Sequence, residues 1–157
     1  MKFPLYVLMA ATLATPLAAL AADHSAHGAE AGHAITLNAG KKWETDGPLR
    51  QAMTVIRTSV ATTLPKAHAG KATPADYEAL SKEVNTQVAY IVENCKLDPK
   101  ADAQLHTVIG EMLNGAEQAE GKQGKSRASG VVQIAQGLNT YGKYFDHTGW
   151  KSISVPH

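Results

Sequence analysis

The chain has 157 residues and a formal net charge of +1, and 44% of its residues are hydrophobic. A chain of this length and apolar content suits one domain built around one core. The near-zero charge, with no basic face and no platform of aromatic residues, argues against nucleic acid as a partner. Seven histidines and a single cysteine are the unusual features of the composition.

Residues 1–21 have the pattern of a secretory signal peptide. Lys2 supplies the positive start, an apolar run follows, and the sequence ALA at 19–21 matches the A-x-A cleavage pattern. Cleavage after Ala21 predicts a periplasmic protein without a membrane attachment. The stretch 3–22 is also long enough for a retained anchor, which is the less favoured alternative.

After this cleavage the mature chain would begin Ala22-Asp23-His24. Its free amine, two deprotonated backbone amides and the imidazole of His24 would form a planar set of four nitrogens, which suits Cu(II) or Ni(II). His27 and His33 follow in a stretch of small and polar residues. The sequence therefore predicts a site for copper or a similar transition metal. Cleavage one residue later would remove the third-position histidine and leave a solvated tail.

The rest of the chain divides by composition into three parts. Residues 22–42 form a flexible segment that contains histidines, residues 43–149 a helical bundle, and residues 150–157 a C-terminal tail. Four helical patterns follow one another within the bundle. They cover residues 46–63, 74–95, 99–120 and 126–146, and the first three have N-caps at Asp46, Thr73 and Asp98. Pro65 is expected to stop the first helix.

Apolar residues recur in each pattern at intervals of three and four residues, and sustained alternation typical of strands is missing. Short connections favour antiparallel neighbours, so the sequence predicts an all-α, up-down-up-down antiparallel four-helix bundle. Its interior should contain the following side chains: Val88, Ile91, Ile109, Leu138 and Tyr141.

Two short stretches, EGK at 120–122 and LNTYGKY at 138–144, resemble the end of cytochrome b562, and the region 43–145 has a similar length and helix order. The resemblance implies the same bundle fold. That family binds haem between a methionine near the start of the first helix and a histidine near the end of the fourth. The matching positions fall near Trp43 and at Gly142, and the C-x-x-C-H motif of the related cytochrome c′ is missing. We therefore expect the fold without the haem.

A second candidate metal site combines Cys95, at the end of the second helix, with His106, on the second turn of the third. A thiolate and an imidazole would make a soft half-site for Cu(I) or Zn(II). The alternative is structural, because cysteine behaves as a small apolar residue in cores and a single histidine beside an apolar stripe usually bonds a neighbour.

No nucleophile lies in a recognisable motif, and no pair of inward E-x-x-H motifs occurs, so an enzyme is not expected. The sequence favours a periplasmic, haem-free bundle that binds copper or a similar metal as a buffer, carrier or resistance accessory. The alternatives are a b562-like electron-transfer protein with substituted haem ligands and an interaction module of the envelope that binds no metal. The sequence names no protein partner.

Overall fold

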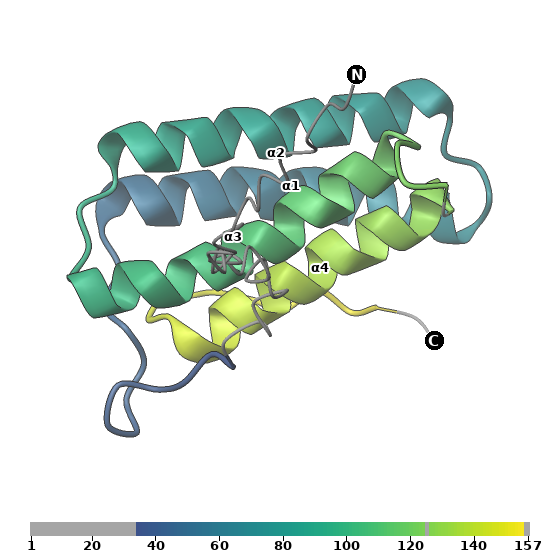
Figure 1. Cartoon of the computed structure of the whole chain (residues 1–157). Helices are drawn as coiled ribbons and strands as arrows, with labels where there is room; N and C mark the ends of the chain where they lie inside the picture. The colour runs from purple at the N-terminus through teal and green to yellow at the C-terminus, as the bar shows by residue number, and fades with distance from the viewer. Residues whose placement is uncertain (1–33, 125, 156–157) are drawn as a thin grey trace, which may run out of the picture. The chain divides into compact units, whose positions relative to one another are not determined.

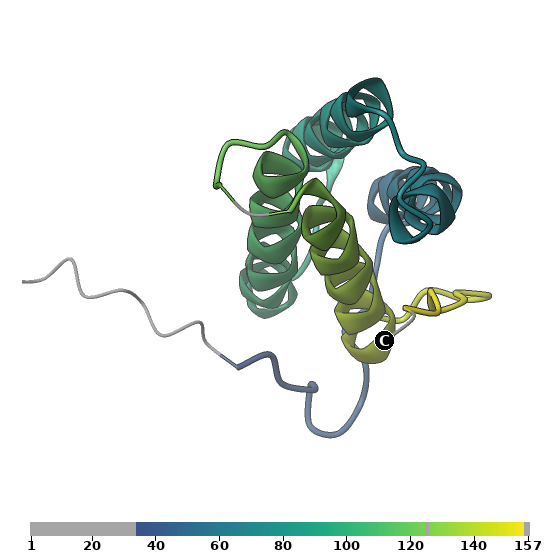
Figure 2. The same cartoon turned by 90° about the vertical axis from the view of Figure 1, so that its right-hand side faces the viewer.

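The computed structural model describes residues 34–124 and 126–155 (Figure 1). They form four helices: α1 (Gly47–His68), α2 (Pro74–Asn94), α3 (Pro99–Ala119) and α4 (Arg127–Tyr144). Each helix packs against its neighbour in sequence, and α1 packs against α4 to close the ring, which Figure 2 shows from one end. The predicted all-α, up-down-up-down four-helix bundle is confirmed. The described residues contain no strand beyond isolated bridges.

The helices begin where the caps predict. Asp46, Thr73 and Asp98 each accept a hydrogen bond from a backbone N–H group in the first turn of the helix that follows. Thr73 and Asp76 form a reciprocal capping box. Caps of this kind contribute about 1 kcal/mol each. Ser126, before α4, makes no such side-chain bond.

The predicted stop of the first helix at Pro65 is wrong, because α1 continues to His68. A proline in the last turn removes only one backbone hydrogen bond, and its fixed φ is compatible with a helix. The apolar stripe also continues, since Leu64 and Ala67 are buried. Gly70, with a φ of 64°, then ends the turn. The other helix ends differ from the predicted ones by one or two residues.

The interior of the bundle is a continuous apolar core. The side chains predicted to be buried are all found there: Val88, Ile91, Ile109, Leu138 and Tyr141. Cys95, which closes the stripe of α2, is only half-buried at the edge of this core. None of the helices in the described ranges is long and apolar enough to cross a bilayer.

The closest helix contact is between α3 and α4, and glycine makes it possible. A Cβ atom on Gly130 would lie 2.5 Å from the carbonyl oxygen of Gly115 and 2.5 Å from the backbone nitrogen of Ala119. A Cβ on Gly137 would lie 2.9 Å from Cγ of Met112. The backbones of α3 and α4 are therefore in direct contact, and a residue larger than glycine at these positions would clash.

Two flanking segments are bound to the same end of α4. We call residues 34–46 the N-terminal flank and residues 145–155 the C-terminal flank. The N–H of Trp43 donates to Tyr144 at 2.8 Å, and the N–H of Asp146 donates back to Trp43 at 2.8 Å. Both flanks thus extend the bundle, including parts that the sequence assigned to a flexible segment and to a tail.

The N-terminal flank folds back on itself through a tight turn. Ala39 and Gly40 both have positive φ, and Asn38 and Lys41 exchange backbone hydrogen bonds around them. In the C-terminal flank, the backbone of Ile153 exchanges two hydrogen bonds with the side-chain amide of Asn139 on α4, at 2.8 and 2.9 Å. Each flank is therefore held by specific bonds.

We expect Gly130→Ala to destabilise the bundle by about 1–3 kcal/mol, because the new methyl group meets backbone atoms that cannot move aside. Urea or thermal unfolding followed by circular dichroism measures the change. Gly110→Ala is the matched control, since nothing lies within 4 Å of its Cβ position. It should stabilise the helix by about 0.5–1 kcal/mol. Equal effects of the two substitutions would contradict the direct backbone contact.

Candidate functional site

The predicted metal site of the N-terminal segment lies outside the residues that the structure describes. Its members are Ala22, Asp23, His24, His27 and His33. Within residues 34–124 and 126–155, no group of three or more His, Cys, Asp or Glu side chains is arranged to hold a metal ion. The second candidate, Cys95 with His106, lies within the described part of the chain.

Cys95 follows α2 and points toward the beginning of α1. Its thiol donates a hydrogen bond of 3.5 Å to Oδ1 of Asp46. Burial and the negative charge of this carboxylate together raise the pKa of the Cys95 thiol to about 12. The thiolate, and not the thiol, is the nucleophile and the metal ligand. At neutral pH this side chain is therefore protonated, which disfavours reaction as a nucleophile.

Asp46 joins three elements at this end of the bundle. One carboxylate oxygen caps α1 by accepting from Leu49, and the other accepts from the N–H of Lys96 at 2.7 Å, in the connection between α2 and α3. Partial burial opposes ionisation, but these backbone donors outweigh it, so the pKa of Asp46 lies below its usual value. The carboxylate stays charged and fixes the thiol of Cys95 beside it.

His106 is exposed and bound to a residue of its own helix. Its side chain is 70% exposed, and Nδ1 lies 2.9 Å from the carbonyl oxygen of Asp102 and 3.5 Å from Oδ2 of the same residue. Over the described part of the chain, no hydrogen bond joins His106 to Cys95. The two side chains are bound to different partners, and the half-site that they would share stays a prediction.

An aromatic cluster at the end of α4 has no counterpart in the predicted sites. The hydroxyl of Tyr141 lies 3.1 Å from Nδ1 of His147, and the ring of Trp150 meets that of Tyr141 edge-on at 4.9 Å. Burial, helped by the positive charge of Arg50, lowers the pKa of His147, so its ring is neutral at pH 7. The sequence feature that could have indicated this cluster is the glycine at position 142, in the last turn of α4.

Trp150 lies directly on Gly142, where a Cβ atom would come within 2.2 Å of its indole ring. Trp43, near the other position that the resemblance to cytochrome b562 marks, is buried and donates its indole N–H to Thr36 at 2.7 Å. Gly142 offers no ligand atom and is covered by Trp150. Trp43 already donates its indole N–H to Thr36. These two positions do not fit a haem.

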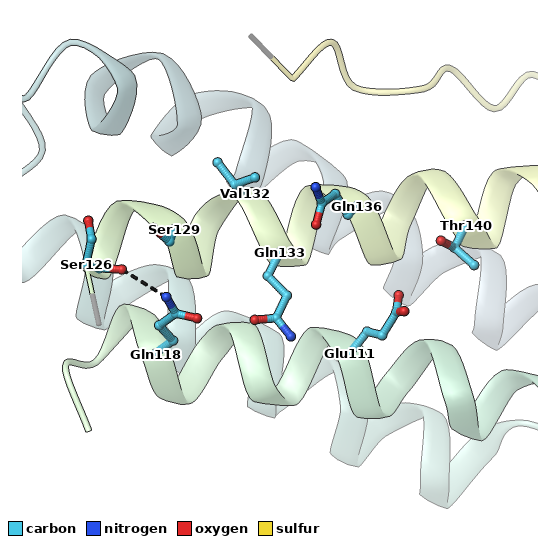
Figure 3. Close-up of a pocket in the computed structure, with 8 residues that line it drawn as sticks. All are labelled: Glu111, Gln118, Ser126, Ser129, Val132, Gln133, Gln136 and Thr140. Atoms are coloured by element: carbon cyan, nitrogen blue, oxygen red, sulfur yellow. Dashed lines mark hydrogen bonds between the residues drawn. The ribbon is translucent and has the colours of Figure 1, made fainter. Parts of the chain in front are cut away.

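A polar groove of about 670 Å³ follows the outer side of α3 and α4. In Figure 3, Gln133 extends from α4 toward α3, and Glu111 extends from α3 toward α4. Gln118 donates to the carbonyl oxygen of Ser126 at 3.2 Å and closes one end of the groove. Amide and carboxylate groups of this kind suit a polar or peptide ligand better than an apolar one.

Comparison with models of protein families, with curated proteins and with solved structures finds no match for this chain. The resemblance to cytochrome b562 therefore stays a prediction. Function has to be argued from the chemistry of the chain's own residues.

We expect Cys95 to react with iodoacetamide at pH 8 at least about tenfold more slowly in the folded protein than in urea. A thiol pKa of about 12, against 9.0 for a free cysteine, leaves very little thiolate at that pH. Because the folded state favours the protonated thiol, Cys95 contributes fully to the free energy of unfolding below pH 9. This contribution is lost as the pH rises toward 12. The rate is measured by mass spectrometry.

Asp46→Asn is the matched variant, since asparagine keeps an oxygen that can cap α1 and removes the negative charge beside the thiol. Folded Asp46→Asn should react faster than the parent protein. Equal rates in the folded and unfolded parent protein would show that Cys95 is not held as described.

Proposed function

We propose that this chain is an exported, haem-free four-helix-bundle protein that binds copper or a similar transition metal. The observation that carries the proposal is the sequence Ala22-Asp23-His24 directly after an A-x-A cleavage pattern. Cleavage after Ala21 creates a terminal amine two residues before a histidine, which is a complete four-nitrogen site for Cu(II). The protein would act as a buffer, a carrier or an accessory in metal resistance.

The contacts of Cys95 and His106 favour a metal site in the N-terminal segment over a metal site in the bundle. Cys95 is held as a neutral thiol by burial and by Asp46, so Cu(I) or Zn(II) would have to displace a tightly held proton there. His106 is held by Asp102 of its own helix. The terminal site requires neither residue, because all its ligands come from three consecutive positions.

The bundle gives such a segment a fixed attachment point. The N-terminal flank is bound to α3 where the N–H of Thr36 donates to Oε1 of Gln104 at 2.8 Å. It is bound to α4 through the backbone of Trp43 and through the ammonium group of Lys42, which donates to Gly142. The residues that follow the histidine-containing segment in sequence are therefore bound to both helices.

A second candidate function is that of an envelope interaction module without a metal. The polar groove between α3 and α4 favours it, because its lining offers both donors and acceptors to a peptide backbone. This function and the metal site are compatible, since they use different residues.

We expect the mature chain to bind one Cu(II) with a planar four-nitrogen ligand set, visible in its absorption and electron paramagnetic resonance spectra. Affinity should fall as the pH falls, because protons compete for the amides and the imidazole. Binding should survive unfolding of the bundle in urea, because the ligands are local in sequence. It should be lost in His24→Ala.

Two controls sharpen this test. One residue added before Ala22 should abolish the site by moving the amine, whereas Cys95→Ser should leave Cu(II) binding unchanged. Mass spectrometry that finds Asp23 as the first residue of the mature chain, or Cu(II) binding that is unaltered in His24→Ala, would remove the proposed site.

Haem added to the purified apoprotein should not give a sharp low-spin spectrum, because Trp150 covers Gly142 and the indole of Trp43 is engaged with Thr36. Absorption spectroscopy in the Soret region measures this. A sharp low-spin spectrum would favour the electron-transfer alternative, with His147 or His106 as the suspected ligand, and the His147→Ala and His106→Ala variants would identify it.

A further inference from the structure

The C-terminal flank returns along α4 and is bound to two helices (Figure 2). The backbone of Ile153 exchanges hydrogen bonds with the side-chain amide of Asn139 on α4. The guanidinium group of Arg57 on α1 donates to the carbonyl oxygen of Lys151 at 2.5 Å and lies 6.0 Å from the centre of the Trp150 ring. The indole nitrogen of Trp150 is buried and has no hydrogen-bond partner among the described residues. Trp150 is therefore held by the contacts around it and not by a hydrogen bond of its own side chain.

His147 fixes the first turn of this flank. Its carbonyl oxygen accepts from the N–H of Trp150 at 3.0 Å, across Gly149, which has a φ of 78°. The ring of His147 lies 4.9 Å from that of Trp150, and its Nδ1 lies 3.1 Å from the hydroxyl oxygen of Tyr141. One imidazole thus contacts both α4 and the tryptophan that covers the end of α4.

The contact between Tyr141 and His147 requires a neutral imidazole. The side chain of Tyr141 is fully buried, and its hydroxyl has no other hydrogen-bond partner in the part of the chain that the structure describes. Because a buried hydroxyl hydrogen needs an acceptor, the hydroxyl of Tyr141 donates to Nδ1 of His147. Nδ1 is therefore unprotonated, and the hydrogen of the neutral ring is on Nε2.

The charged and titratable groups near this ring come from α1, α4 and the flank itself. Arg50 on α1 repels an imidazolium, whereas Asp146 in the flank attracts one. Arg57, also on α1, is engaged with the backbone of the flank. Tyr141 on α4 keeps its proton, because burial raises its pKa. Burial of the ring and the charge of Arg50 outweigh the effect of Asp146, so the pKa of His147 lies below its usual value of 6.5.

Protonation of His147 conflicts with this arrangement. A hydrogen on Nδ1 would meet the hydrogen of the Tyr141 hydroxyl, which would have to turn and leave its own hydrogen unpaired in the core. In a detached flank, His147 is solvated and takes up its proton at the ordinary pKa of 6.5. Because the docked flank takes up the proton only at lower pH, docking is strongest above this range and weakens as the pH falls through it. Each unit by which the pKa is lowered weakens docking about tenfold at acidic pH.

We propose that His147 is a pH-sensitive latch, which holds residues 147–155 against α4 and α1 when its ring is neutral and loosens them when its ring is protonated. Loosening would uncover Gly142 and the ring of Tyr141, on which Trp150 lies. This inference goes beyond the proposed metal site and does not depend on it, because none of these residues belongs to that site. Histidine suits such a role, since its charge changes between pH 5 and 8.

Hydrogen exchange of the purified mature chain, followed by nuclear magnetic resonance with a chelator present, tests the latch. The amide of Ile153 reports on the flank, because its N–H donates to Asn139. Its protection factor should fall between pH 7.5 and 5, about tenfold for each unit by which the measured pKa of His147 lies below 6.5. The N–H of Trp43, which donates to Tyr144 in the other flank, should keep its protection.

His147→Asn separates the titration from the packing. Asparagine places an oxygen near the position of Nδ1, where it can accept from Tyr141, but it does not take up a proton at these pH values. This variant should protect Ile153 equally at both pH values. His106→Asn is the matched control, since His106 is exposed and bound within its own helix, and it should leave the loss of protection unchanged. Circular dichroism checks that the chains are folded.

Three results would overturn the inference. The first is a measured pKa of His147 at or above 6.5, and the second is equal protection of Ile153 at both pH values in the parent chain. The third is an equal loss of protection at Trp43, which would indicate that acid weakens the whole bundle. All three are measured on the parent chain, so they hold even if His147→Asn does not fold. Because no metal is present, failure of the proposed Cu(II) site would not affect them.

Discussion

The direct backbone contact between α3 and α4 is the constraint on which the rest of the structure depends. Gly115 and Gly130 bring the two helices so close that a single methyl group would strike backbone atoms. Glycine lowers helix propensity by about 1 kcal/mol at each position, so packing has to compensate for its presence. The same approach brings Gln118 within hydrogen-bonding distance of Ser126 and thereby closes the outer groove. A looser crossing would lose both the packing and the groove.

The opposite end of the bundle depends on a charge instead. Asp46 caps α1, accepts from Lys96 beyond α2 and faces the thiol of Cys95, so one carboxylate fixes three parts of the chain. The backbone donors keep it ionised, and its charge in turn keeps the thiol protonated. A free cysteine in an oxidising compartment survives best in this form, which agrees with the export that the N-terminal sequence predicts.

The fold could be predicted from the sequence because its signals are local. Apolar spacing located four helices, and caps such as Asp46 located their beginnings, but the stop at Pro65 failed because continued burial of Leu64 outweighed one missing hydrogen bond. The stacking of Trp150 on Gly142 and the groove could not be predicted, since both arise from residues brought together by the fold. The ligands of the proposed terminal metal site are consecutive in sequence, so that site could be predicted without the fold.

The arrangement of core and flanks indicates where function can lie. A bundle that works through its interior needs a space between its helices, as a haem site does, but here apolar side chains fill that interior and Trp43 and Trp150 cover the end of α4. Both tryptophans come from the flanks and not from the helices. The described helices therefore form a filled, rigid support, and the metal site proposed for this chain takes its ligands from outside them.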